Sequence, residues 1–369
     1  MRLLRSERLS AVLLIAAAAL GLVLANTPVG PAIIAFTHVS LGYLTLAHWV
    51  TEGLLAIFFF IAAIELKHEL VHGELDSLRK AAVPAAAAIG GVAVPALIYL
   101  AVAHDQGLGV GWPIPTATDI AFALGVLALV GRRLPSRVRT LLLALAVLDD
   151  LIAILIIAIF FTSRLDWLPL ILGVVVIAAF ALVGRLRLRP WTIAVLVLLG
   201  IAAWLLVALS GIHPTVAGVA LGLVLASAPG SVARHALEPF SNGIVLPVFA
   251  FVAALVALPS VGLGELSPAF WAIVIALPVG KLIGITAGGS IAIAMTRSRV
   301  ETPPVGDLVV VAALGGIGFT VSLLMNQLAW KTNTALVNEG TIAVIVASVL
   351  AAIIGSTVTA LRSRRYPDA

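Results

Sequence analysis

Cysteine is absent from the 369-residue sequence, which excludes a disulfide framework and any metal site built on cysteine thiolates. Charged residues are scarce as well, because they make up 11% of the chain, whereas a soluble domain carries roughly a quarter. Hydrophobic residues make up 62%, and the mean hydropathy is +1.19. This composition excludes an ordinary water-soluble domain and indicates a protein that crosses a membrane several times.

The net charge of +5 raises the question of a nucleic-acid partner. The positions of the basic residues argue against nucleic-acid binding, because these residues lie in short loops between apolar runs and form no continuous basic tract. We therefore expect a lipid bilayer as the surrounding partner, no nucleic acid and no soluble protein partner.

Twelve apolar runs are long enough to cross a bilayer as helices. They cover residues 10–26, 46–65, 82–103, 114–130, 138–162, 166–184, 191–209, 212–228, 240–258, 268–296, 304–329 and 335–361. Residues 1–27 also have the order of basic, apolar and small residues found in a signal peptide. The distribution of charge across the loops favours a retained first helix.

Basic residues alternate strongly between successive loops. With the N-terminus in the cytoplasm, nearly all of the 22 Lys and Arg residues fall in cytoplasmic loops or termini. Arg164 and Lys331 fall outside, and Lys281 falls within a span. The sequence therefore predicts an all-α membrane protein of about twelve transmembrane helices with both termini cytoplasmic.

Four charged residues lie deep in these runs, namely Asp119, Asp149, Asp150 and Lys281. At about 1.5 Å per helical residue, all four fall near the middle third of an apolar core about 30 Å thick. A charge there costs roughly 2.5 to 3.5 kcal/mol even on the most lenient scale. An ion pair that only joins helices would explain Asp119 and Lys281. One lysine cannot cancel two adjacent acids, so the doublet indicates a cation pathway coupled to protons.

Two of the predicted spans contain helix-breaking residues. Pro113 and Pro115 precede Asp119, and Gly315, Gly316 and Gly318 interrupt a late span. Close helix packing is the alternative explanation of such glycines. Interruptions in the fourth and eleventh spans, each the middle of a triplet, indicate two inverted-topology repeats with a site at the midplane. Asp119 is then placed to offset positive helix ends, and Lys281 negative ones.

The same segments resemble the NhaA family of sodium–proton antiporters. The resemblance rests on PTATDIAFALGVLAL, LLLALAVLDDLIAI, LPVGKLIGI and GGIGFTVSLL, and it is supported by FFFIAAIELKHEL, SGIHPTVAG and HALEPFSNGIVLPVFAF. These motifs follow in order over nearly the whole chain. The family is itself an example behind the inverted-repeat rule, so the two arguments are not independent.

The resemblance implies a role for each deep residue. Asp149 and Asp150 would bind Na+ or Li+, or protons; Lys281 would pair with Asp149; and Thr118 and Asp119 would lie where the two broken helices cross. It also implies three pH-response residues, Glu65, Glu69 and His213. The two glutamates also fit an ordinary solvated loop face, and His213 also fits a helix-capping histidine.

The family further implies electrogenic, pH-regulated exchange of Na+ or Li+ for H+ at a bacterial plasma (inner) membrane, by a homodimer with no cofactor and no enzymatic activity. Residues 82–162 and 268–361 would form the repeat-bearing core of a single domain, and residues 10–65 and 166–258 the interface helices. The sequence departs from the family at Glu52, at residues 252–254 and in a short 27–45 loop. The loop concerns dimer geometry more than the chemistry.

Two other functions remain open. A sodium-coupled organic-anion symporter of the same fold class would need a roomy polar cavity for its solute. An intramembrane aspartyl protease would share a proton between Asp119 and Asp150. That activity gives no role to the adjacent acid or to Lys281.

Overall fold

The computed structural model describes residues 7–42, 44–73, 77–104, 107–162, 165–258, 263–295 and 303–366. The chain is almost wholly helical, with one small antiparallel hairpin, β1 (Ser40–Leu41) and β2 (Leu44–Thr45), among these residues. The first half contains α1 (Glu7–Ala25), α2 (Gly30–Thr37), α3 (Leu46–His48), α4 (Leu55–His72), α5 (Leu78–Val102), α6 (Ile120–Val130), α7 (Ser136–Phe160) and α8 (Trp167–Val183). The second half contains α9 (Pro190–Leu209), α10 (Thr215–Val224), α11 (Ser227–Phe240), α12 (Leu246–Ala253), α13 (Pro268–Ile275), α14 (Lys281–Met295), α15 (Val305–Gly315), α16 (Phe319–Ala329) and α17 (Thr334–Ser363).

The predicted helical membrane fold is confirmed. Within the described residues, 7 helices are long and apolar enough to cross a membrane, and 3 further pairs of helices are bent at a short break. The predicted segments 166–184 and 212–228 correspond to the shorter apolar helices α8 and α10. The outward faces of α8 and α9 carry exposed large aliphatic residues, as expected for contact with lipid tails.

One predicted boundary is wrong. The segment expected at 240–258 begins at Ser227, because α11 continues through a π-helical segment, η5 (Ser241–Val245), into α12. The sequence SVARHALEP in α11 is amphipathic, so a search for apolar runs does not detect it. Pro229 lies in the first turn of α11, where a missing backbone donor costs nothing.

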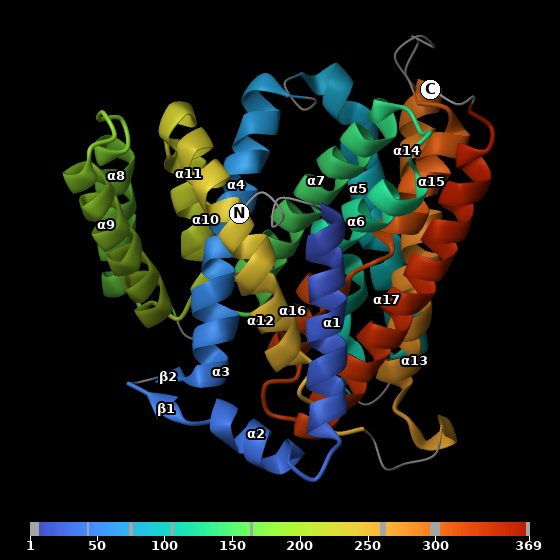
Figure 1. The fold of residues 1–369 in the computed structure, drawn as a ribbon, viewed down its shortest axis with the longest axis horizontal. Helices are drawn as coiled ribbons and strands as arrows, with labels where there is room; N and C mark the ends of the chain where they lie inside the picture. The colour runs from blue at the N-terminus through green and yellow to red at the C-terminus, as the bar shows by residue number, and fades with distance from the viewer. Residues whose placement is uncertain are drawn as a thin grey trace.

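The helices of the two predicted repeats pack closely around α5 and α14 (Figure 1). Gly90 on α5 faces Gly284 on α14, and a Cβ on either residue would overlap the carbonyl oxygen of the other. This reciprocal contact brings the two backbones together. Helices α8 and α9 pair with each other at one side of the molecule, shown in yellow-green at the left of Figure 1.

Both predicted interruptions are present. The 3₁₀ turns η3 (Leu108–Gly111) and η4 (Ile114–Thr116) lead into α6 with a bend of 41°, and α15 meets α16 with a bend of 48°. The breaks touch each other, because the backbone amide of Asp119 donates to the carbonyl of Ile317 over 2.6 Å. Gly318 permits this approach, since a Cβ there would lie 2.9 Å from the carbonyl oxygen of Ala117.

Candidate ion-binding site

Asp149 and Lys281 form a fully buried ion pair between α7 and α14. The Nζ of Lys281 lies 2.6 Å from Oδ2 of Asp149, and both side chains are 0% exposed. Lys281 is the first residue of α14 and follows a π-helical segment, η7 (Ala276–Gly280). Such π-bulges are frequent at functional sites.

Thr118 connects this ion pair to the second broken helix. Its hydroxyl oxygen lies 2.7 Å from Oδ2 of Asp149 and 2.8 Å from the carbonyl oxygen of Gly315. A hydroxyl carries one proton, so Thr118 donates to one of these acceptors at a time. The carboxylate, hydroxyl and carbonyl oxygens are the ligand types that hard cations prefer.

Three carboxylate oxygens of the doublet lack a hydrogen-bond partner within the described part of the chain: Oδ1 of Asp149 and both oxygens of Asp150. Both residues are nearly inaccessible, at 1% and 3% exposure. Buried carboxylate oxygens are normally satisfied, because leaving them bare is costly. These atoms are therefore suited to accept a proton or a cation.

Asp119 is fully engaged at the crossing of the broken helices. Its Oδ1 accepts from the amide of Phe122 at the start of α6. Its Oδ2 accepts from both the amide and the hydroxyl of Thr320, over 3.1 and 2.7 Å, at the start of α16. One carboxylate thus offsets the positive ends of two helices, as the sequence predicted. Lys281 bonds instead to Asp149.

Two site residues were missed in the sequence, Thr320 and Ser348. The Ser348 hydroxyl on α17 accepts from the amide of Phe319 over 3.2 Å. Thr320 lies two residues after Gly318, in the first turn of α16, and its contact with Asp119 joins positions 201 residues apart. Ser348 lies in an apolar run, and no neighbouring residue in the sequence indicates its contact with Phe319.

The three pH-response candidates lie in different surroundings. Glu65 on α4 pairs with Arg234 of α11 over 3.4 Å, and Glu69 lies one turn further along α4, close to Gly73 at its end. His213 precedes α10 and is 6% exposed, with its Nδ1 2.9 Å from the hydroxyl of Thr215. This contact joins two side chains beside the start of α10, whose N-cap residue is Pro214.

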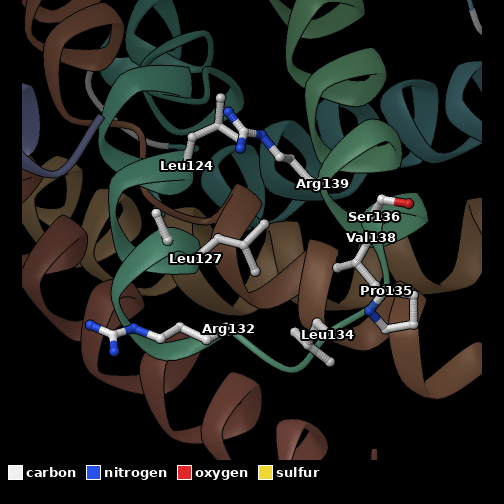
Figure 2. Close-up of a pocket in the computed structure, with 10 residues that line it drawn as sticks. Leu124, Leu127, Arg132, Leu134, Pro135, Ser136, Val138 and Arg139 are labelled. Carbon is white, nitrogen blue, oxygen red and sulfur yellow. The ribbon is translucent and has the colours of Figure 1, made fainter. Parts of the chain in front are cut away.

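A cavity of about 410 Å³ lies where α6 turns into α7. Leu124 and Leu127 of α6 form one wall, and Val138 and Arg139 of α7 the other (Figure 2). In this view Arg139 extends toward Leu124, whereas Arg132 points away. The four deep charged residues do not line the cavity. The cavity nevertheless adjoins α6, which begins directly after Asp119, and α7, which carries Asp149 and Asp150.

The three departures also have defined places. Glu52 lies in a π-helical segment, η2 (Trp49–Leu54), and its carbonyl accepts from the indole of Trp204. Residues 252–254 end α12 beside α1, where Ala253 and Ala254 are buried. The short 27–45 loop holds α2 and the β1–β2 hairpin, at the bottom of Figure 1.

Comparison with known proteins assigns a family to this arrangement. Residues 1–359 match the family model described as Na+/H+ antiporter 1. The protein named Na(+)/H(+) antiporter NhaA 2 of Clavibacter michiganensis is 55% identical, over 98% of this chain and 92% of its own. The Na(+)/H(+) antiporter NhaA of Tropheryma whipplei is 46% identical, over 96% and 94%.

The fold also matches a solved structure, that of the sodium proton antiporter MjNhaP1 from Methanocaldococcus jannaschii at pH 8. The TM-score is 0.60, over 97% of this chain and 92% of that one. At 14% identity, this likeness concerns the fold alone. The chain is a multi-pass membrane protein and belongs to the Na+/H+ antiporter 1 family.

Proposed function

We propose that the protein exchanges Na+, or Li+, for H+ across the membrane. The observation that carries this proposal is the set of three unsatisfied carboxylate oxygens on Asp149 and Asp150, buried beside Lys281. The names of the curated relatives support it. Within the described part of the chain, no residue donates a hydrogen bond to the carboxylate of Asp150. This carboxylate can therefore take either a proton or a cation.

Exchange follows from competition at this doublet. A cation bound by Asp150, Asp149 and the oxygens around Thr118 requires ionised carboxylates, so it displaces protons. Protons displace the cation in the same way on the other side of the membrane. If more protons than cations move per cycle, the membrane potential contributes roughly 2.3 kcal/mol per charge for each 100 mV, and transport is electrogenic.

Alternating access would come from movement of one group of helices against the other. The core would comprise residues 82–162 and 268–361, and the interface helices residues 10–65 and 166–258. Twelve spans would place both termini in the cytoplasm, by the distribution of charge. We also propose that the protein forms a homodimer in a bacterial plasma membrane. Its pH regulation would act through Glu65 and Glu69.

Proton flux in proteoliposomes tests the function. We expect Na+ or Li+ added outside to release protons from wild-type vesicles, and Asp150→Asn to abolish this signal, because an amide can neither exchange a proton nor neutralise a cation. Asp166→Asn is the matched control, since the Asp166 carboxylate caps the start of α8. Sodium-dependent flux retained by Asp150→Asn would refute the assignment.

A further inference from the structure

A second buried carboxylate lies away from the ion site, at the end of the molecule where α7 and α15 begin and α17 ends. Asp307 of α15 is 0% exposed. Its Oδ2 lies 3.0 Å from Nε of Arg137, and its Oδ1 lies 2.8 Å from Nε of Arg362. The hydroxyl of Tyr366 lies 2.8 and 2.9 Å from the two carboxylate oxygens.

The remaining contacts hold the two arginines and the tyrosine to one another. Nη2 of each arginine donates to the Tyr366 hydroxyl, over 3.1 Å from Arg137 and 3.3 Å from Arg362. The Arg362 guanidinium also lies 5.2 Å from the centre of the Tyr366 ring. Asp307 occupies the first turn of α15, where a negative charge is favourable. We call these four residues the Asp307 cluster.

The Asp307 cluster joins helices that meet again at the ion site. Helix α7 runs from Arg137 to Asp149, about 18 Å at about 1.5 Å per residue, and α15 runs from Asp307 to Gly315, about 12 Å. At the far ends of these paths, Thr118 bridges Asp149 and Gly315. The two helices are thus tied at both ends, and α17 lies alongside α15 (Figure 1).

We propose that the Asp307 cluster is a positioning element that fixes how α7 lies against α15, and thereby the spacing between the Asp149 carboxylate and the Gly315 carbonyl. This inference rests on the proposed cation binding at that site. Arginine keeps its charge at any physiological pH, so the cluster stays closed while protons and cations exchange. None of its residues belongs to the proposed ion site.

Sodium affinity tests the proposal. We expect Asp307→Asn to raise the apparent KM for Na+ about tenfold, the equivalent of one charge-assisted hydrogen bond, while turnover at saturating Na+ changes less than about threefold. Arg137→Gln should behave similarly, and Arg137→Lys should restore part of the affinity by keeping a charge beside Asp307. Arg364→Gln is the matched control, because this exposed neighbour lies outside the cluster. A folded Asp307→Asn protein with the wild-type KM would overturn the proposal.

A spectroscopic measurement separates this proposal from the function itself. The chain has no cysteine, so spin labels can be placed on Thr140→Cys of α7 and Val305→Cys of α15 without removing native thiols. We expect one narrow distance distribution in the wild-type background and a broadened or shifted one with Arg137→Gln. An unchanged distribution would overturn the positioning role even if transport is sodium-dependent. If the wild-type protein shows no sodium-dependent flux while Arg137→Gln broadens the distance distribution, the proposed function is refuted and the positioning role is not.

Discussion

The chain buries two aspartates beside basic partners, and their surroundings differ sharply. Asp307 receives donors on both oxygens from two arginines and a tyrosine. Asp149 receives a lysine and a threonine on one oxygen, its other oxygen has no partner in the described part of the chain, and both oxygens of Asp150 are bare as well.

This difference separates a fixed charge from an exchangeable one. Arginine does not lose its proton in proteins, and each oxygen of Asp307 already accepts a charge-assisted hydrogen bond from an arginine. Lysine and bare carboxylates can both change protonation state when buried. Burial of a carboxylate alone therefore says little about transport; the number of its oxygens left without a donor says more.

Stability should show the largest contrast between the two regions. We expect Asp307→Asn to lower the free energy of unfolding by about 2–3 kcal/mol, because the buried side chain loses charge-assisted hydrogen bonds from two arginines. The arginines themselves, 51% and 19% exposed, remain partly solvated. Lys281→Met should cost about 1–2 kcal/mol, since Asp149 can take up a proton and become neutral. Reversible unfolding in mixed micelles measures both. Equal costs would break the distinction.

Much of this contrast was hidden in the sequence. The depth of Asp149 and Lys281 within apolar runs predicted a shared site near the midplane, and the resemblance to the NhaA family implied that the two residues pair. Asp307 lies near the start of the predicted span 304–329, where an acidic residue is common and does not indicate a buried site. Its burial depends on Arg362 and Tyr366, which are 55 and 59 residues away. Contacts over such separations depend on tertiary packing, which local patterns do not encode.

The helix breaks were predictable for a different reason. Proline and glycine change the backbone where they stand, so residues 113–118 and 315–318 carried the signal themselves. The contact between the breaks was not encoded locally. The amide of Asp119 reaches the carbonyl of Ile317, and Ser348 caps Phe319 from a third helix.

The close approach of the breaks gives the next prediction. Gly318→Ala should destabilise the protein by about 1–3 kcal/mol, as overpacking does, because the new methyl group would meet the carbonyl of Ala117 at 2.9 Å and Leu277 at 2.8 Å. Gly264→Ala makes the same change where nothing lies within 4 Å. Equal unfolding curves for the two variants would show that the crossing can relax, and the ion site would then be less constrained than the Asp307 cluster.

Thr118 tests whether the exchangeable site depends on single contacts. Thr118→Val removes the hydroxyl that faces both Asp149 and Gly315, and we expect sodium affinity to fall roughly 10- to 100-fold, as for loss of one hydrogen bond to a charged group. Thr116→Val is the control, since its hydroxyl bonds to the carbonyl of Pro113. Sodium titration of proton flux measures both variants. An unchanged affinity in Thr118→Val would exclude its oxygen as a ligand or positioning group.

His213 provides a third kind of buried ionisable group, one that neither pairs with an acid in a salt bridge nor binds the cation. Its Nδ1 lies 2.9 Å from the hydroxyl of Thr215, beside the start of α10 and apart from the doublet. We expect His213→Gln to leave the pH profile of transport unchanged, because this contact is local to α10. Proton flux in proteoliposomes at several pH values measures the profile. A profile shifted by His213→Gln would instead make this histidine a pH sensor, and exchangeable protons would then extend beyond the Asp149–Asp150 doublet.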